Sequence, residues 1–415
     1  MSVQNGGWRN TILAGLANYI DAGSIVAGSA ALALWKDQYG LSDTFIGLIA
    51  AFSANAISAG IGALVGGILC DRYGRKRIYQ YDMLFYAFGM LWLVFASAPW
   101  MIVLGFVLVG LAVGADIPAS WSLIAELAPD RRRGRHSGLA QILWYLGPVV
   151  VLVSYLLLEP LGILASRLVF AHLAILALAL TLLRLRMQES AKWERARERP
   201  RGDRADWRVL LQPRHLKSMG FLVGMYGFWN LWAGTNGFFF PYILRTVGSQ
   251  TQATSVALQA VSFGLAMVSI FTVFMLLSDR VNQRLLFGIS AAMQIVGMSL
   301  LAWLPLTLPV VLMHIALMQL GGGFGAQSFF QLWSAELFPT LARSTAQGVT
   351  FAIVRIGLGL WSFFVPVLTA TGFTTLAWIL TGFLVTSGAI GLLGAPRNEG
   401  KSLEELEGER GAPSA

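Results

Sequence analysis

Three ionisable side chains, Asp21, Asp116 and Arg355, stand inside long apolar stretches of the sequence. An ionisable residue within a membrane segment costs about 2.5–3.5 kcal/mol on insertion scales, so it usually faces a cavity or a partner. Each carboxyl group can bind and release a proton when its surroundings change. The guanidinium can form an internal ion pair with Asp21 or Asp116, or it can bind an anionic group on a substrate. We favour the internal pair, because an unpaired buried cation is costly.

A charged segment at residues 125–141 is repeated at residues 335–351. The matching positions are 210 residues apart and include Glu126 and Glu336, Arg133 and Arg343, and Gly138 and Gly348. Each copy lies between two apolar runs and therefore predicts a charged hairpin between buried helices. A repeat of half the chain predicts two similar halves, as in transporters. We interpret the two glutamates and two arginines as gate charges between helices.

The composition favours a bilayer as the solvent of this chain. Hydrophobic residues make up 56% and charged residues 12% of the sequence, whereas soluble proteins carry about 25% charged residues. The single cysteine, Cys70, excludes an intramolecular disulfide and argues against a cysteine-based metal site. No metal cluster, phosphate-binding loop or nucleophile triad is recognisable. We therefore expect no cofactor, no metal and no enzymatic activity.

Twelve segments reach the roughly 20 apolar residues that cross a bilayer. They centre on Ala22, Asn55, Gly89, Val113, Val149, Leu176, Phe228, Gly264, Gly297, Gly323, Leu358 and Thr386. The predicted fold is an all-α membrane protein with twelve transmembrane helices in two pseudo-symmetric bundles. The predicted divisions are a first bundle at 1–183, a basic linker at 184–217, a second bundle at 218–396 and a polar tail at 397–415.

The basic residues predict the orientation of the chain. Connections after even-numbered spans, the linker and the two tails together carry 26 lysines and arginines, and the other connections hold only Lys36, Arg167 and Arg245. Cytoplasmic loops are enriched in basic residues, so both termini and the linker are expected in the cytoplasm. This distribution also accounts for the net charge of +9 without a nucleic-acid partner.

A glycine-rich and charged motif follows the second span, with the sequence Gly67-Ile-Leu-Cys-Asp71-Arg72-Tyr-Gly74-Arg75-Lys76. It resembles the G-x-x-x-D-R-x-G-R-K signature of the major facilitator superfamily, which implies gating roles for Gly67, Asp71, Arg72, Gly74 and Arg75. We expect Asp71 to meet the positive N-terminus of the eleventh span near Ser344. A degenerate copy of the motif occupies residues 279–284 of the second half.

Further motifs are similar to those of the sugar porters within that superfamily. They are Glu126-x-x-Pro129-x-x-x-Arg133-Gly134, Glu336-x-x-Pro339-x-x-x-Arg343, Glu189-Ser-Ala-Lys-Trp193 and Gly400-Lys-Ser-Leu-Glu-Glu405. The resemblance implies two six-helix halves that rock about a central site and move a sugar or a polyol such as inositol, often with a proton.

The resemblance assigns proton coupling to Asp21, because Asp-Ala-Gly-Ser-Ile-Val-Ala-Gly is similar to the D-T-x-V-I-S-G of the family's first span. The sequence departs from the family at the fourth span. Proton-coupled sugar porters place an arginine there, and this chain has Phe106. Asp116 lies lower in the same span and is the alternative proton carrier.

The resemblance also implies the substrate-binding side chains. Gln141 matches a glutamine of the fifth span that binds sugar hydroxyls, and Asn230 and Asn236 match amides of the seventh span. Gln331 and Arg355 occupy positions where the family commonly has tryptophan. Amides both donate and accept hydrogen bonds, which suits hydroxyl groups.

Several alternatives remain open at this stage. The chain could export rather than import its substrate, and Arg355 would suit a sugar acid or a sulfonated sugar. A nutrient sensor of the same fold usually has a long cytoplasmic extension, and the tail here is under twenty residues. We expect a monomer in the plasma membrane.

The predicted topology can be tested with reporter fusions. A reporter fused after Arg184 should be cytoplasmic and one fused at Pro305 should be external, because an even number of spans separates the linker from each terminus. A cytoplasmic reporter at Pro305 would show that the span count is wrong.

Overall fold

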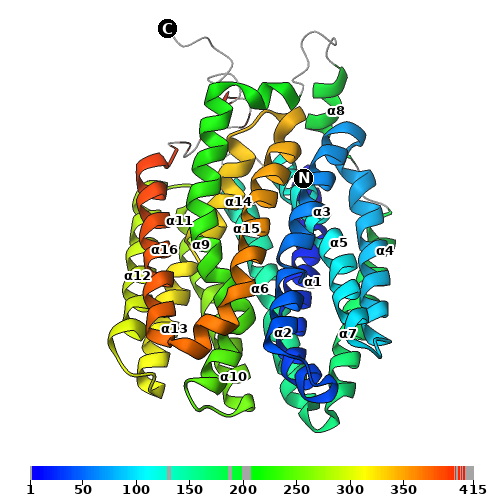
Figure 1. Ribbon diagram of the computed structural model, residues 1–415. Coiled ribbons are helices and arrows are strands. Elements are labelled where there is room, and N and C mark those ends of the chain that lie inside the picture. Colours follow the sequence, from blue (N-terminus) through cyan, green and yellow to red (C-terminus); the bar gives the residue numbers. More distant parts are fainter. Residues whose placement is uncertain are drawn as a thin grey trace.

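The computed structural model describes residues 2–128, 132–185, 189–198, 207–396, 398, 401, 403 and 405–406. Helices dominate these residues, and Figure 1 shows them arranged as two bundles standing side by side. Helices α4, α5 and α7 lie at one flank, and α12, α13 and α16 lie at the other. Parts of the predicted linker (186–188 and 199–206) and most of the predicted tail, including Arg397, lie outside the described residues.

Each half contains the elements expected for one bundle. The N-terminal half comprises α1 (Ser2–Tyr39), α2 (Asp43–Ala51), α3 (Ile57–Tyr73), α4 (Arg75–Val94), α5 (Pro99–Leu127), α6 (Arg133–Leu158), η1 (Glu159–Leu161) and α7 (Ile163–Arg184). The linker contains α8 (Ala191–Glu198) and η3 (Trp207–Leu211). The C-terminal half comprises α9 (Pro213–Thr246), α10 (Gln252–Ser269), the π-helical η4 (Ile270–Phe274), α11 (Met275–Leu277), α12 (Gln283–Trp303), α13 (Leu308–Gly322), α14 (Ala326–Glu336), η5 (Thr340–Ala342), α15 (Arg343–Thr371) and α16 (Phe373–Gly394).

The predicted twelve-helix fold class is confirmed. Eight helical segments of the described chain are long and apolar enough to cross a membrane by themselves. The other four predicted spans correspond to α1, to α2 with α3, to α4 and to α9, which are interrupted or carry polar ends. Every predicted centre falls in a helix, except Asn55 and Gly323, which fall at breaks within spans.

Two spans are broken beside the interface between the halves. The second span is interrupted between α2 and α3, where Asn55 lies in a turn, and the tenth is interrupted between α13 and α14 at Gly323–Gly325. Irregular backbone at membrane depth is tolerated where it is buried in protein or lines a cavity. The breaks therefore indicate where a polar site can be built.

Glycines allow the helices beside the interface to approach closely. A Cβ at Gly62 of α3 would lie 2.2 Å from the Leu111 carbonyl oxygen of α5. Across the interface, a Cβ at Gly67 of α3 would lie 2.3 Å from the Ser344 oxygen of α15, and one at Gly348 would lie 2.3 Å from the Ala63 oxygen. Small residues at such positions let backbones pack in contact. The two halves thus meet along α3 and α15 with no room for side chains.

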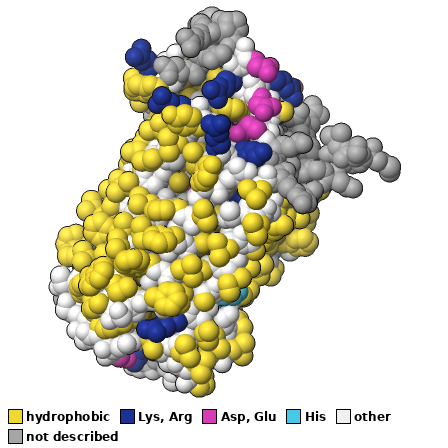
Figure 2. Space-filling model, turned by 90° about the vertical axis from the view of Figure 1, so that its right-hand side faces the viewer, with side chains coloured by type: hydrophobic (Ala, Val, Ile, Leu, Met, Phe, Trp, Pro, Cys, Tyr) yellow, Lys and Arg dark blue, Asp and Glu magenta, His cyan; other side chains and the backbone are white. Residues whose placement is uncertain are grey.

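Charged side chains gather at one end of the molecule, which we call the linker end because α8 lies there; the opposite end is called the far end. Figure 2 shows a band of hydrophobic side chains over the flank, with lysine, arginine and carboxylate groups concentrated above it at the linker end and few at the far end. The band is what a lipid-facing surface requires.

The α3–α15 contact predicts that Gly67→Val will destabilise the protein. The added side chain must push the helices apart, and overpacking of this kind costs about 1–3 kcal/mol. We expect a lower melting temperature in detergent. Gly264→Val is the matched control, because a Cβ at Gly264 meets no atom within 4 Å. Equal melting temperatures for the two variants would contradict the close contact.

Candidate functional site

A cavity lies between the two bundles. Its walls come from α1, the α2–α3 break and α6 in the first half, and from α9, α10, α13, α14 and α15 in the second. Its polar lining consists of Asn55, Asn230, Asn236, Gln319, Gln327 and Arg355, and its aromatic lining of Trp144, Tyr145, Trp229, Trp232 and Phe263. A concave site with aromatic walls and a few convergent polar groups is the usual form of a small-molecule site.

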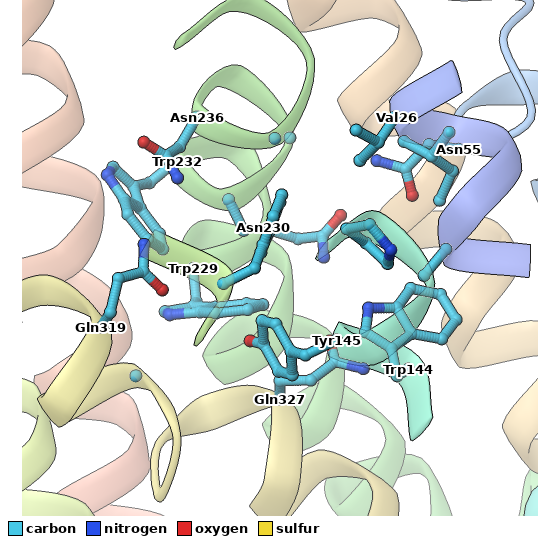
Figure 3. Close-up of a pocket in the computed structure, with 18 of the residues that line it drawn as sticks. Val26, Asn55, Trp144, Tyr145, Trp229, Asn230, Trp232, Asn236, Gln319 and Gln327 are labelled. Carbon is cyan, nitrogen blue, oxygen red and sulfur yellow. The ribbon is translucent and has the colours of Figure 1, made fainter. Parts of the chain in front are cut away.

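The amide side chains surround the cavity and keep hydrogen-bonding capacity. In Figure 3, Asn236 and Gln319 lie on one side, Asn55 lies on the other, and Asn230 reaches between them. Within the described residues, Asn230 Oδ1 and Gln327 Nε2 have no hydrogen-bond partner. Amides that are free to donate and accept match the hydroxyl groups of a polyol.

Two of the predicted binding residues, Asn230 and Asn236, line this cavity, and three further amides were missed. Asn55 lies at the break in the second span, and Gln319 and Gln327 flank the break in the tenth. Amides beside glycine-rich interruptions of apolar spans are the signal that could have found them, because a broken span near the interface is where a polar site can form.

Arg355 also lines the cavity, but its partners differ from those expected. Its Nη1 donates to the Asn55 side chain and, over 3.2 Å, to the Asn55 carbonyl, and its Nη2 lies 3.4 Å from the Tyr226 hydroxyl. The guanidinium also lies over the Phe351 ring, 4.4 Å from its centroid. The expected ion pair with Asp21 or Asp116 is wrong for this structure. The carbonyl freed by the break at Asn55 takes the place of a carboxylate.

Gln141 and Gln331 lie outside the cavity lining and contact each other. Nε2 of Gln141 donates to Oε1 of Gln331 over 2.5 Å, and both side chains are buried. Each lies about one helical turn closer to the linker end than a lining residue of its own helix, Tyr145 on α6 and Gln327 on α14. The pair joins the two halves on the linker-end side of the cavity.

Asp116 is paired with Arg184, the first residue of the predicted basic linker. Arg184 ends α7 and is fully buried, and its Nη1 lies 3.3 Å from Asp116 and 3.2 Å from Asp82. Residue 184, the first of the predicted linker, therefore packs with the first bundle, because it is the last residue of α7 and its guanidinium is buried there. Asp82 was missed because it follows the basic residues that begin α4.

Asp21 is fully buried near this cluster, and both of its carboxylate oxygens lack a hydrogen-bond partner among the described residues. It is close enough to Asp116 and Arg184 to interact with their charges. It does not line the cavity, although the adjacent Ala22 does. Phe106, which replaces the family's arginine, packs edge-on against Trp35 at 5.8 Å between ring centroids.

The predicted gate charges form two ion pairs exchanged between the halves. Nη1 of Arg343 lies 2.8 Å from Glu126, and Nη2 of Arg133 lies 2.8 Å from Glu336. In each pair the glutamate comes from one half and the arginine from the other. All four side chains are almost completely buried, so the linker end is closed in this structure.

The motif after the second span adds a cation and a helix cap to this closure. Arg75 is fully buried, with Nη2 3.1 Å from both Glu126 and Asp71 and 2.6 Å from the Thr340 carbonyl of the other half. Asp71 accepts hydrogen bonds from the backbone N–H groups of Ser344 (3.3 Å) and Thr345 (2.6 Å). The contact expected between Asp71 and the start of the eleventh span is confirmed.

The degenerate copy of the motif keeps the equivalent helix cap. Asp279 accepts from the backbone N–H groups of Gly134 (2.9 Å) and Arg135 (3.3 Å), which begin α6. These donors lie 210 positions before Ser344 and Thr345. Burial raises the pKa of the Asp279 carboxyl, and the two backbone hydrogen bonds oppose that rise.

The linker and the tail support the gate from outside. Glu189 accepts from the backbone N–H groups of Arg75 (3.2 Å) and Lys76 (3.0 Å), and it lies against Gly74, whose φ of 100° favours glycine. In the tail, Asn398 donates to Glu336 over 3.0 Å. Arg72 of the same motif is exposed and lies over the Tyr73 ring.

The fold and this site define a membrane transporter in which two helical bundles enclose a central cavity and close it at one end. The comparisons with known proteins agree. Residues 11–366 match the Major Facilitator Superfamily. The chain belongs to the Major Facilitator Superfamily, and it is a multi-pass membrane transporter rather than an enzyme.

Individual relatives and solved structures cover almost the whole chain. The chain is 45% identical over 410 residues to the "Minor myo-inositol transporter IolF" of Bacillus subtilis, covering 97% of this chain and 93% of the relative. It is 24% identical to the "Glucose transporter GlcP" of Staphylococcus epidermidis, with 96% and 95% coverage. Its fold matches the proton:xylose symporter XylE bound to 6-bromo-6-deoxy-D-glucose, with a TM-score of 0.83, 18% identity and 98% and 99% coverage. For an inward open structure of XylE from E. coli the TM-score is 0.70, with 19% identity and 97% and 99% coverage.

The exchanged ion pairs predict the effect of charge reversal. Arg133→Glu or Glu336→Arg alone should open the linker end, because breaking a buried pair costs about 3–5 kcal/mol. The double reversal should restore much of the closure. A reporter cysteine at Ser122, which bonds to Gln347 across the interface, measures opening by maleimide labelling in a Cys70→Ser background. Equal labelling of single and double variants would rule out the pair as a gate.

Proposed function

We propose that this chain carries a neutral cyclic polyol of the inositol class through the central cavity by alternating access, in symport with protons and in the direction of uptake. The observation that carries this proposal is the lining of the cavity, where five amide side chains and several tryptophan and tyrosine rings surround the space. The 45% identity to a protein named as a myo-inositol transporter supports the same substrate class.

The chemistry of an inositol fits this lining. It is a ring with a hydroxyl group on every carbon, so each part of its edge needs a hydrogen-bond donor and an acceptor. Asn55, Asn230 and Asn236, with Gln319 and Gln327, supply both kinds of group from several directions. The faces of the ring expose C–H bonds, which suit the aromatic rings of Trp144 and Trp229.

Arg355 supports a second candidate, an anionic sugar derivative such as a sugar acid. It is the only charged side chain among the described residues that line the cavity, and neutral groups of Asn55 and Tyr226 hold it. A carboxylate on a substrate could replace the Asn55 carbonyl on the guanidinium fork. We rank the neutral polyol first, because the amides outnumber the single cation and the guanidinium already has partners.

Alternating access then follows from the interface. The charge pairs Glu126–Arg343 and Glu336–Arg133 hold the linker end closed in the state described here. On the linker-end side of the cavity, the Gln141–Gln331 hydrogen bond is a second layer of contact across the same interface. We infer that both layers separate when the halves rock apart, and that Gln141 and Gln331 then gain access to the substrate.

Coupling to protons is assigned to Asp21 and Asp116. Both are fully buried in the first half, and neither lines the cavity. A buried carboxyl group favours its neutral form unless a cation is close. Rocking of the halves can change the access of each carboxyl group to water, which is the requirement for binding a proton on one side and releasing it on the other.

The membrane and orientation belong to the same proposal. We place the chain in the plasma membrane with both termini and the linker in the cytoplasm, because basic residues concentrate on that side. The gathering of charged side chains at the linker end in Figure 2 supports this orientation.

The proposed substrate can be tested by uptake into proteoliposomes that contain the purified protein. Radiolabelled myo-inositol should be accumulated in response to an imposed pH gradient. Asn230→Ala should raise its Michaelis constant by a factor of about 2–10, as expected when a hydrogen bond worth about 0.5–1.5 kcal/mol is lost. Arg355→Gln should leave the affinity for myo-inositol within a few-fold of wild type.

The same uptake assay is repeated with a panel of other solutes, namely glucose, xylose and glucuronate. Gln38→Ala, which changes an exposed amide outside the cavity, is the control for Asn230→Ala. Selective transport of glucuronate that disappears in Arg355→Gln would replace the polyol with the anionic candidate. Uptake of none of these solutes would refute both.

A further inference from the structure

The strongest feature outside the cavity is a group of ionisable side chains inside the first bundle. It consists of Asp21 from α1, Asp82 from α4, Asp116 from α5 and Arg184 from α7, and none of them is more than 6% exposed. Four helices therefore bring three carboxyl groups and one guanidinium together at a place that the cavity does not reach.

The group is unbalanced in charge. Among the described residues, Arg184 is the only cation that forms an ion pair with these carboxyl groups. The other ionisable groups beside them are Cys70, Tyr79 and Tyr86, with Tyr19 and its hydrogen-bonded partner His172 further along α1 and α7. Arg75, at the start of α4, is held by Glu126 and Asp71. Three carboxylates and one guanidinium carry a net charge of −2, so the group is neutral when two protons are bound. An uncompensated charge is very costly in a dry bundle interior, so release of the two protons requires that water reach the group in another state of the transport cycle.

The hydrogen bonds of the group are also incomplete. Arg184 uses one nitrogen, Nη1, for Asp82 (3.2 Å), Asp116 (3.3 Å) and the Tyr79 carbonyl (2.9 Å). Its Nε and Nη2 have no partner in the described chain, and the two carboxylate oxygens of Asp21 have none either. Asp82 and Asp116 lie within hydrogen-bonding reach of each other, so a proton on one carboxyl group can be shared with the other. The free nitrogens of Arg184 can stabilise Asp21 once that carboxyl loses its proton.

We propose that Asp82 and Arg184 complete the proton-coupling centre with Asp21 and Asp116, and that this centre carries two protons for each substrate molecule. The inference rests on the proposed proton symport and deepens it. Arg184 is a positioning residue that holds Asp82 and Asp116 and fixes how many protons the three carboxyl groups must bind. Since the group lies within the first bundle, its protons move by a route separate from the substrate cavity.

The number of protons can be measured from the gradient at which net flux stops. Proteoliposomes are loaded with myo-inositol, or with the best substrate of the uptake panel, and the membrane potential is clamped at zero with potassium and valinomycin. If two protons move with each substrate molecule, a tenfold proton gradient balances a hundredfold substrate gradient. If one proton moves, it balances a tenfold gradient.

We expect the wild-type protein to give the hundredfold balance. Asp82→Asn should give the tenfold balance, because two carboxyl groups and one guanidinium are neutral with one proton. Glu159→Gln, which changes an exposed carboxylate at the far end, should keep the wild-type value. A tenfold balance in the wild type, or a wild-type balance in Asp82→Asn, would overturn the proposal. A substrate gradient at zero net flux that does not depend on the proton gradient would refute proton symport itself, and with it the proposed function rather than only the number of protons.

Variants of Arg184 provide a second and independent test. Arg184→Lys keeps the charge and should keep the hundredfold balance. Arg184→Gln should lose accumulation driven by a pH gradient, while exchange of labelled for unlabelled substrate continues. A merely structural arginine would instead reduce exchange and melting temperature together, and that result would exclude the positioning role.

Discussion

The carboxylates that close the linker end, Glu126 and Glu336, are each neutralised by an arginine of the other half of the chain. A buried charge without a partner is among the most costly features a membrane bundle can contain. The closed end therefore depends on the contact between the halves, and the close packing of α3 against α15 at Gly67 and Gly348 brings the partners into reach. The helix-capping carboxylates Asp71 and Asp279 act across the same interface in the same way.

The two copies of this arrangement differ in sequence, and a different residue supplies the additional contact to the glutamate in each copy. In the first half, Arg75 stands four residues after Asp71 and adds a second cation to Glu126. The corresponding position after Asp279 is Gln283, which is neutral and accepts a hydrogen bond from Trp333. On that side the tail supplies the missing donor, because Asn398 bonds to Glu336. Among the contacts of the described residues, Glu126 thus has Arg75 beside its arginine from the other half, and Glu336 has Asn398.

The fold could be predicted almost completely from the sequence, whereas the site could be predicted only in part. Apolar runs, the repeat and the basic loops depend on local composition, so the twelve spans and the two halves were recoverable. The amides Asn230 and Asn236, which the resemblance singled out, line the cavity. The partner of Asp116 could not be found in this way, because Arg184 lies at the end of its helix and only the direction of its side chain decides between water and the interior. The Arg355–Asn55 contact could not be predicted for a related reason. A break in a helix leaves a backbone carbonyl free to accept a hydrogen bond, and the residue types alone do not show it.

The exchange of charges between the halves also bears on how such a chain could have been assembled. In this structure the glutamate and the arginine of each hairpin pair with the other half rather than with each other, so a single six-helix half would lack both of these partners. Two identical halves could satisfy both at once by pairing about a two-fold axis, since each would give its arginine to the other. The present arrangement is therefore compatible with an ancestral homodimer whose copies were later fused, and fusion freed each copy to change separately. The neutral Gln283 and the contact of Glu336 with the tail are examples of changes made in one copy only.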